Sequence, residues 1–441
     1  MTRIALFVRS RRFVWGIAIV LIMGASLAAR SAHTESTATA ADTGTSWKSD
    51  VLKVEALGAK TGAEALNAEV TRSKVAKAKA ATSSISNGAA SVGSGPAAAQ
   101  LPPSDQTAFV LRQRIIGQVN PKSIVASTTG LVTAQNMYSH TISIFLPDGK
   151  LKGTVDDSVD LSRFGIAGHP GISRGAPVEA AFTRDAKHVY VSNYSMFGKN
   201  FGPEGLDTCS PATAPDKSFL YRIDATTLKI DQVIPVGAVP KFVAVSPDDS
   251  TVLVTDWCSW TLSVVNVKSA RLVAAIPLGG AYPRGIAISQ DSRTAFVAAL
   301  GSNRIVKVDL ASKTVSTFAQ TGDGPREILI SPNGQYLYVT NSKSGTVSKV
   351  DAANGKVRIT VATGDTPLSM AISSDGLALY IVNYQSSTVS KLRTSDLSQL
   401  ARMATDSHPI GIAYEPTTGS VWVASDGGGI LVFQDRKPPA L

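Results

Sequence analysis

The 441-residue chain is poor in cysteine, histidine, aromatic residues and charge. It has two cysteines and five histidines, and aromatic and charged residues make up only 6% and 17% of it. Two cysteines exclude a disulfide-rich scaffold and a zinc site built from four cysteines. Glycine, proline and β-branched residues are plentiful after residue 109, which favours strands joined by turns over helices. We therefore expect an all-β fold.

Signatures of catalysis are also scarce. The five histidines have no metal-ligand spacing; they are His33, His140, His169, His188 and His408. The chain has no Gly-x-Ser-x-Gly motif, and the glycines at 427–429 indicate a turn rather than a phosphate-binding loop. The sequence therefore predicts no metal, no cofactor and no catalytic residue, although it leaves an enzyme open as an alternative.

The formal charge of +10 is spread along the chain. Residues 1–108 contain 12 Lys and Arg against 7 Asp and Glu, and residues 109–441 contain 31 against 26. Each part therefore carries about +5, so the part expected to fold is only mildly basic.

The chain has one long apolar run, Phe13–Ala29, which follows several arginines. This pattern, over residues 1–30, is typical of an export signal, and the run is also just long enough to be an uncleaved membrane anchor. Either way the remainder is expected outside the cytoplasm: secreted, periplasmic or tethered through residues 13–29. Residues 31–108 are rich in Ala, Ser, Lys and Gly and predict a disordered linker with at most a short helix.

A repeat of about 42 residues fills the rest, 109–436. Its mark is a proline followed by an apolar strand and a polar turn, at Pro121, Pro177, Pro240, Pro283, Pro325, Pro367 and Pro409. The last four intervals are 43, 42, 42 and 42 residues. Four short strands in 42 residues match a propeller blade, whose faces are buried only by neighbouring blades. Seven prolines therefore predict a seven-bladed β-propeller.

The seventh repeat ends too early to supply its own fourth strand. Its third strand is expected at 429–434, and only a few residues follow. The segment Phe109–Val119 precedes the first repeat and can pair beside the last blade, which would close the ring and remove exposed strand edges. We expect such a closed, monomeric ring.

The second strands end in a recurring tetrapeptide: Tyr338-Val339-Thr340-Asn341, with variants at Tyr190–Asn193 and Tyr380–Asn383. This resembles the signature of the YVTN family of β-propeller repeats. The resemblance implies the fold and relatives among exported bacterial proteins, surface-layer proteins and single-stranded-DNA binders, whereas propellers also include lactonases and dehydrogenases.

Lactonase-type propellers hold a cation with channel carboxylates and asparagines. The residues here that could imitate such a set are Glu179, Glu327, Asn193, Asn341 and Asn383. The asparagines, however, recur as turn residues of the repeat, where hydrogen bonding from the side chain to the backbone explains them.

Two intervals are longer than 42 residues. The first insertion, at about 156–174, lies between strand four of blade 1 and strand one of blade 2, and the second, at about 195–217, lies between strands two and three of blade 2. Both connections emerge on one face of an antiparallel blade, so that face is the candidate binding surface.

The two cysteines fall in neighbouring loops of this face. Cys209 lies in the second insertion, and Cys258 lies in the loop between strands two and three of blade 3. Because adjacent blades place these loops side by side, we predict a Cys209–Cys258 disulfide; two free thiols are the alternative.

The residue after the blade-opening proline is basic in four blades: Lys122, Lys241, Arg284 and Arg326. These residues are expected at the channel mouth, where they would bind an anion, or would cap strands and pair with Glu179, Glu327 or Asp256. Three aromatic residues are expected nearby and would stack on bases or sugars or pack between blades: Tyr194, Trp257 and Tyr384.

The leading hypothesis is a non-catalytic binding scaffold whose loop-decorated face holds an anionic or aromatic-bearing ligand such as a polysaccharide, a peptide or single-stranded DNA. The alternatives are a lactonase-like hydrolase, a propeller-type oxidoreductase that uses channel residues, and a structural envelope protein.

Overall fold

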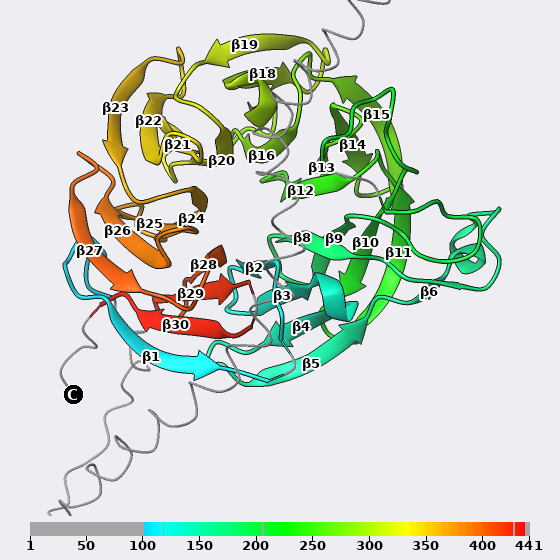
Figure 1. Cartoon of the computed structure of the whole chain (residues 1–441), viewed down its shortest axis with the longest axis horizontal. Helices are drawn as coiled ribbons and strands as arrows, with labels where there is room; N and C mark the ends of the chain where they lie inside the picture. Colours follow the sequence, from blue (N-terminus) through cyan, green and yellow to red (C-terminus); the bar gives the residue numbers. More distant parts are fainter. Residues whose placement is uncertain (1–100, 118, 205–206, 427, 437–441) are drawn as a thin grey trace, which may run out of the picture. The chain divides into compact units, whose positions relative to one another are not determined.

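The computed structural model describes residues 101–117, 119–204, 207–426 and 428–436. Strands dominate these residues and form four-stranded sheets arranged as blades around a central channel (Figure 1). The predicted signal or anchor at 1–30, and nearly all of the predicted linker at 31–108, lie outside the described residues. In the part of the chain that is described, no helix is long and apolar enough to cross a membrane.

Six blades use four consecutive strands each. Blade 1 comprises β2 (Ser123–Ala126), β3 (Val132–Asn136), β4 (Thr141–Phe145) and β5 (Leu151–Asp156). Blade 2 comprises β8 (Pro177–Phe182), β9 (His188–Asn193), β10 (Phe219–Asp224) and β11 (Lys229–Pro235). Blade 3 comprises β12 (Pro240–Val245), β13 (Thr251–Asp256), β14 (Thr261–Asn266) and β15 (Arg271–Pro277). Blade 4 comprises β16 (Pro283–Ile288), β17 (Thr294–Ala299), β18 (Arg304–Asp309) and β19 (Val315–Ala319). Blade 5 comprises β20 (Pro325–Ile330), β21 (Tyr336–Asn341), β22 (Thr346–Asp351) and β23 (Val357–Ala362). Blade 6 comprises β24 (Pro367–Ile372), β25 (Ala378–Asn383), β26 (Thr388–Arg393) and β27 (Gln399–Ala404).

Blade 7 is closed by the N-terminal strand, as predicted. Its own strands are β28 (Pro409–Glu415), β29 (Ser420–Ser425) and β30 (Ile430–Gln434), and β1 (Val110–Ile115) pairs antiparallel with β30 (Figure 1). Phe109 stacks on Phe433 with ring centroids 4.8 Å apart. The two ends of the propeller are therefore joined by a sheet and by core packing.

Polar contacts buried beside this junction reinforce it. The Nζ atom of Lys391 lies 2.6 Å from Oδ1 of Asp435 and donates to the carbonyl of Ala108, and neither charged side chain is exposed. Arg436 pairs with the other Asp435 oxygen at 3.0 Å and donates to Tyr414. Because buried charges are costly without partners, this network holds the closing strand in one register.

The core lies between blades, where apolar side chains of adjacent sheets meet. One cluster joins Leu253 and Leu262 of blade 3 to Ile286 and Val297 of blade 4, all nearly inaccessible to solvent. Each blade therefore buries its faces against its neighbours, as the repeat predicted.

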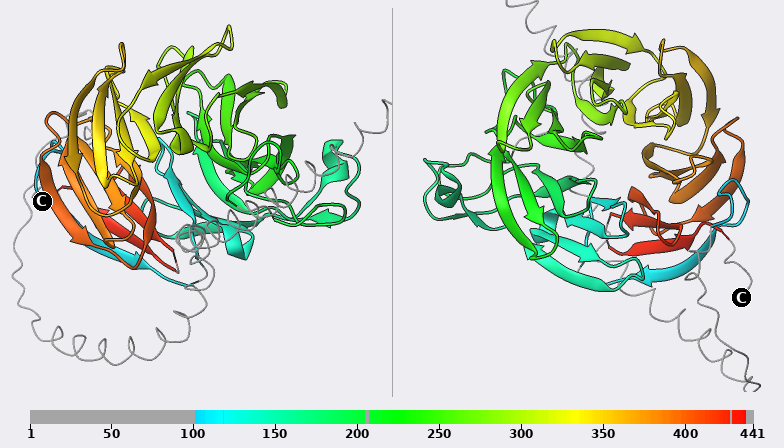
Figure 2. Two further views of the ribbon diagram at one scale, coloured as in Figure 1. Left: turned by 45° about the horizontal axis from the view of Figure 1, so that its top comes forward. Right: turned by 180° about the vertical axis from the view of Figure 1, so that it is seen from behind.

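The two predicted insertions lie on one face, called here the insertion face. The first contains β6 (Val159–Asp160), the 3₁₀ turn η3 (Leu161–Phe164) and β7 (Ile172–Ser173), and it projects from the ring beside blade 2 (Figures 1 and 2). Arg174 of the first insertion forms a backbone bridge with Phe197 of the second, and His169 stacks on Phe201 with centroids 3.8 Å apart. Short 3₁₀ turns also follow β3 and β17: η2 (Met137–Ser139) and η4 (Leu300–Ser302).

A repeated backbone bond ties the loops of the insertion face together. In blade 5 the N–H of Ser342, just after strand two, donates to the carbonyl of Gly324, just before the opening proline, at 2.8 Å. The equivalent bond in blade 6 runs from Tyr384 to Thr366 at 3.0 Å. The start of each innermost strand therefore lies against the loop between strands two and three.

Candidate functional site

The innermost strands enclose a cavity of about 290 Å³ in the channel. Its wall comes from β2, β8, β12, β20, β24 and β28, so it belongs to the ring rather than to one blade. Its polar lining consists of residues two positions after the opening prolines: Ser123, Glu179, Glu327 and Ser369. The remaining lining is mostly apolar and includes Phe242, Leu329, Met370, Ile372 and Ile412.

The pairing between strands one and two is irregular at the positions that hold the charged residues. In six blades the pairing register between strands one and two shifts just after the opening proline, for example between Pro325 and Ile328. Such bulges re-aim side chains. Arg326 and Glu327 lie within this shift, and Glu327 lines the cavity.

The four predicted basic residues share one electrostatic environment. Burial lowers the pKa of Lys122, and Arg326 and Arg284 lower it further. Burial also lowers the pKa of Lys241 to about 8 and that of Arg326 to about 9, with Arg284 contributing to both shifts. Arg284 therefore acts electrostatically on each of the other three side chains.

The two lysines of this set have acidic partners from loops. Nζ of Lys122 lies 3.6 Å from Oδ2 of Asp426, and Nζ of Lys241 lies 3.1 Å from Oδ1 of Asp207. Burial raises the pKa of Asp207, but the Lys241 ammonium outweighs this effect and brings it to about 2. Both members of the Lys241–Asp207 pair are therefore ionised at neutral pH.

Unlike the two lysines, the two arginines have no acidic partner among the described residues. Within the described residues, neither Arg284 nor Arg326 has a carboxylate oxygen within 4.0 Å, and Nε of Arg326 is buried with no hydrogen-bond partner. Glu179 and Glu327 influence both arginines through space without pairing directly. Both side chains are partly exposed, and a guanidinium that has no carboxylate partner keeps donors available for an anionic group.

Glu179 and Glu327 are held in a poorly solvated setting. Burial raises the pKa of Glu179 to about 7, against the opposing effects of Arg284 and the Ser123 hydroxyl. Burial and the nearby Glu179 raise the pKa of Glu327 to about 8. Near neutral pH the mouth therefore has more positive than negative charge.

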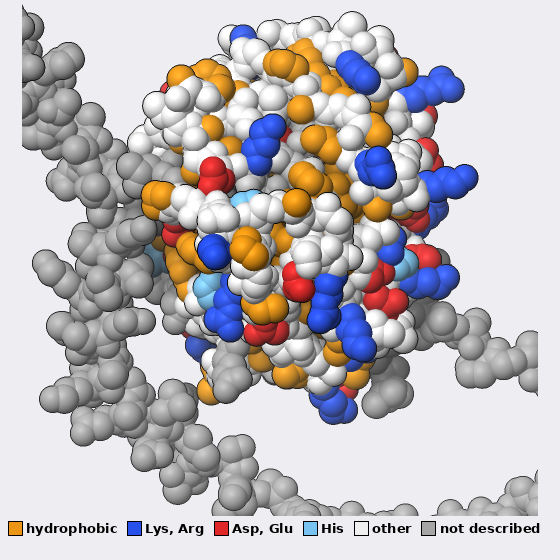
Figure 3. All heavy atoms as spheres, turned by 90° about the vertical axis from the view of Figure 1, so that its right-hand side faces the viewer, with side chains coloured by type: hydrophobic (Ala, Val, Ile, Leu, Met, Phe, Trp, Pro, Cys, Tyr) orange, Lys and Arg blue, Asp and Glu red, His pale blue; other side chains and the backbone are white. Residues whose placement is uncertain are grey.

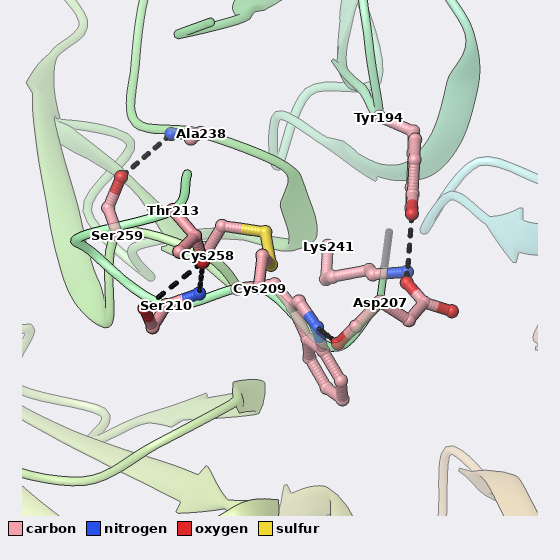
Figure 4. Close-up of a disulfide and its surroundings, with 10 residues drawn as sticks. Tyr194, Asp207, Cys209, Ser210, Thr213, Ala238, Lys241, Cys258 and Ser259 are labelled. Carbon is pink, nitrogen blue, oxygen red and sulfur yellow. Dashed lines mark hydrogen bonds and ion pairs between the residues drawn. A yellow bond between two sulfur atoms is a disulfide. The ribbon is translucent and has the colours of Figure 1, made fainter. Parts of the chain in front are cut away.

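The predicted disulfide is present (Figure 4). Cys209 and Cys258 are bonded with a Cα–Cα distance of 5.3 Å, so the prediction is confirmed. The bond anchors the insertion two residues from Asp207, whose carboxylate accepts from the Tyr194 hydroxyl at 2.9 Å. The indole of Trp257 donates to the Asp207 carbonyl at 2.9 Å. These contacts hold Asp207 at the mouth.

The three predicted aromatic residues are mostly covered by protein. Tyr194, Trp257 and Tyr384 are 7%, 9% and 5% exposed. Nζ of Lys241 lies 4.2 Å from the Tyr194 ring centroid and 5.2 Å from that of Trp257, which are cation–π distances. Tyr384 packs on His408 with centroids 4.5 Å apart. In this structure Tyr194 and Trp257 support the lysine, and stacking on a ligand stays a prediction.

Two of the three recurrent asparagines donate to side chains, which corrects the expected backbone bonding for Asn341 and Asn383, whereas Asn193 bonds to the backbone as expected. Nδ2 of Asn341 donates to the hydroxyls of Thr346 and Ser348, each at 3.0 Å, and Asn383 repeats this contact with Thr388 and Ser390. Both asparagines are fully buried within their blades. Asn193 instead donates to the carbonyl of Phe219. These asparagines stabilise blades and do not line the cavity.

Asp256, proposed as a partner for the basic set, occupies the equivalent position in blade 3. Its carboxylate accepts from the hydroxyls of Thr261 and Ser263, each at 2.7 Å, and from the N–H of Gly237. It therefore does not pair with Lys241. Sequence reasoning missed Asp207 and Asp426 as the real partners: Asp207 comes from the second insertion, outside the repeat pattern, whereas Asp426 stands 17 residues after Pro409, the repeat position that holds Trp257 in blade 3.

One group in the described residues has the spacing of metal ligands. Atoms of His188, Asp224 and Asp231 lie within 4.8 Å of one another on blade 2, away from the cavity. Arg222 already binds Asp231 through two hydrogen bonds of 2.8 Å, and Asp224 caps the following turn. These contacts explain the group without a metal.

The outer surface beside the insertion face shows no block of one charge. On the side that carries β11 and β15, basic and acidic side chains are interspersed among apolar ones (Figure 3). This side of the ring therefore carries no concentrated field of one sign.

Comparisons with known proteins agree with the architecture. Residues 279–363, which include all strands of blades 4 and 5, match the family described as lactonase, 7-bladed beta-propeller. No curated protein matches the chain. The chain is similar in structure to hydrazine synthase from Kuenenia stuttgartiensis, with a TM-score of 0.57, 19% identity, and coverage of 72% of this chain and 96% of that one. That likeness concerns the fold alone, and the chain is a seven-bladed β-propeller with a lactonase-like stretch over two blades.

Proposed function

We propose that this chain is an exported propeller of the YVTN repeat type that binds an anionic ligand at the channel mouth without transforming it. Arg284 and Arg326 carry the proposal, because they lie at the mouth without an acidic partner among the described residues. A carboxylate or phosphate would supply the missing acceptor, and arginine suits both through paired hydrogen bonds.

The shape of the site favours an end group over a long chain lying flat. The cavity of about 290 Å³ is at the lower limit of pockets that hold small molecules. An acidic polysaccharide, a peptide with its terminal carboxylate, or single-stranded DNA would each present one anionic group to the arginines. The Cys209–Cys258 bond supports export, since such bonds persist in oxidising compartments. A monomer, and a tether through residues 13–29, remain parts of the proposal.

Calorimetric titration with citrate and with inorganic phosphate tests the proposal. We expect both probes to bind the wild type and the double variant R284A/R326A to bind at least about tenfold more weakly, because each charged hydrogen bond contributes about 1.5–3 kcal/mol. The control R293A/K313A removes the same charge from exposed turns of blade 4. Equal affinity of wild type and R284A/R326A would refute the arginine site.

A lactonase-like hydrolase is the second candidate, because the family match includes Arg326 and Glu327. A carboxyl with a pKa near neutral can act as a general base on water, and an arginine can stabilise the oxyanion that forms. Dihydrocoumarin hydrolysis tests this candidate. Turnover by the wild type that is lost in both E179Q and E327Q would favour it, whereas no turnover by the wild type leaves the binding function.

A further inference from the structure

The polar groups of the channel form two successive layers. The first position after the opening prolines holds Arg284 and Arg326, and the second holds Glu179 and Glu327. Of these four residues, the two glutamates line the cavity, and the two arginines lie outside its lining but act on both glutamates electrostatically. The second layer also contains the hydroxyls of Ser123 and Ser369. Along the innermost strands the cationic position therefore comes one residue before the carboxylate position, nearer to the insertion face.

Beyond the carboxylate layer the wall becomes apolar. The strands continue from Glu327 to Leu329 and from Ser369 to Met370 and Ile372, and all of these residues line the same cavity. Phe242, at the second position after Pro240, contributes an aromatic ring to the cavity wall within the carboxylate layer. The order along the channel is therefore cation, carboxylate, apolar pocket.

This order matches a zwitterion with an apolar tail. Consecutive strand residues are about 3.3 Å apart. The carboxylate and ammonium of an α-amino acid are attached to one carbon, so their separation is similar to the spacing of adjacent layers. A bare cation would bind Glu179 and Glu327 only while facing two unneutralised arginines, whereas a zwitterion satisfies both layers.

We propose that the channel binds a free α-amino acid with an apolar side chain: its carboxylate on Arg284 and Arg326, its ammonium between Glu179 and Glu327, and its side chain in the cavity. This inference rests on the proposed function, because it names the anion bound by the arginines. The cavity of about 290 Å³ suits a side chain the size of leucine and excludes a folded domain or a duplex.

Three truncated ligands separate the contributions. Isocaproate is leucine without its ammonium, isopentylamine is leucine without its carboxylate, and glycine is leucine without its side chain. For the wild type at pH 8, where Glu179 is largely ionised and Glu327 about half ionised, we expect leucine to bind roughly 10- to 100-fold tighter than isocaproate. Glycine should also bind more weakly, because it buries no apolar surface.

Variants test which protein groups bind the ammonium and which bind the carboxylate of the ligand. E179Q/E327Q should bind leucine and isocaproate equally, because it removes the acceptors for the ammonium, while R284A/R326A should lose affinity for both ligands. The single variants E179Q and E327Q, checked by circular dichroism, give the same comparison if the double variant does not fold.

The outcomes distinguish the two proposals. Isocaproate binding as tightly as leucine in the wild type, with both weakened in R284A/R326A, overturns the amino-acid inference and leaves the anion site. Absence of binding by either anion, or binding of isopentylamine equal to that of leucine, overturns both.

Discussion

The ammonium of Lys241 lies 3.1 Å from the carboxylate of Asp207, although the two residues come from an innermost strand and an inserted loop. The Lys241 side chain is almost fully buried beneath the Tyr194 and Trp257 rings. Burial by itself would favour neutral lysine, so the loop carboxylate is what keeps this position charged.

Substitution D207N should lower the pKa of Lys241 below its present value of about 8 by one unit or more, because the carboxylate that stabilises the ammonium is lost. The rate of Lys241 acetylation as a function of pH, read by peptide mass spectrometry, measures this shift. D148N is the control, because Asp148 pairs with exposed Lys150. An unchanged Lys241 profile in D207N would show that burial alone sets its pKa.

The Cys209–Cys258 bond should stabilise the second insertion locally. Replacing both cysteines by serine is expected to lower the free energy of unfolding by about 2–4 kcal/mol, since the bond closes a long loop. Hydrogen exchange should accelerate at 194–218 and stay unchanged in blade 6. The intact wild type should weigh about 2 Da less than its reduced form. Uniform exchange across all blades would contradict a local role.

The ring could be predicted from the sequence because a repeat of 42 residues assigns each residue to a position within a blade. The opening prolines are the first residues of β8, β12, β16, β20, β24 and β28, as the register predicted, and Lys241 and Arg284 follow them as the second residues of β12 and β16. The same register placed Cys258 beside Cys209. Each of these inferences needs only position within the repeat.

The remaining features depend on loops that the period does not describe. Asp207 reaches Lys241 through a loop whose path is set by the disulfide and by Trp257. The asparagine signature was assigned to turns because its partners, such as Thr346 and Ser348, lie on the next strand. The second channel layer, with Ser123 and Ser369, could have been found by reading one position further along each repeat.

The closing strand should depend on Lys391 more than on the equivalent lysine of blade 5. Lys391 pairs with buried Asp435 at 2.6 Å, whereas Lys349 donates only to the carbonyls of Thr394 and Ser395. K391M leaves a buried carboxylate short of a partner and should cost about 3 kcal/mol, against about 1 kcal/mol for K349M. Urea unfolding compares them; equal losses would remove the special role of the junction.

Glu179 and Glu327 should make the stability of the propeller depend on pH. Folding raises their pKa values from 4.5 to about 7 and about 8, so the folded state holds these protons more tightly than the unfolded state does. Stability is then greatest below about pH 4.5 for these two groups and falls as the pH rises through 7 and 8, which is opposite to the behaviour of a salt-bridged carboxylate.

One pKa unit corresponds to about 1.4 kcal/mol, and contact with channel water reduces the effect, so each group should lower the free energy of unfolding by about 1–3 kcal/mol between pH 5 and pH 8. E179Q and E327Q cannot ionise and should therefore be more stable than the wild type at pH 8 and similar to it at pH 5. Urea unfolding at both pH values measures this, with exposed E204Q as the control. A bound ammonium favours the ionised carboxylates, so saturating leucine should reduce the difference in the free energy of unfolding between the wild type and the two variants at pH 8. Parallel stability profiles for the wild type and all variants would instead show that the carboxyls are well solvated.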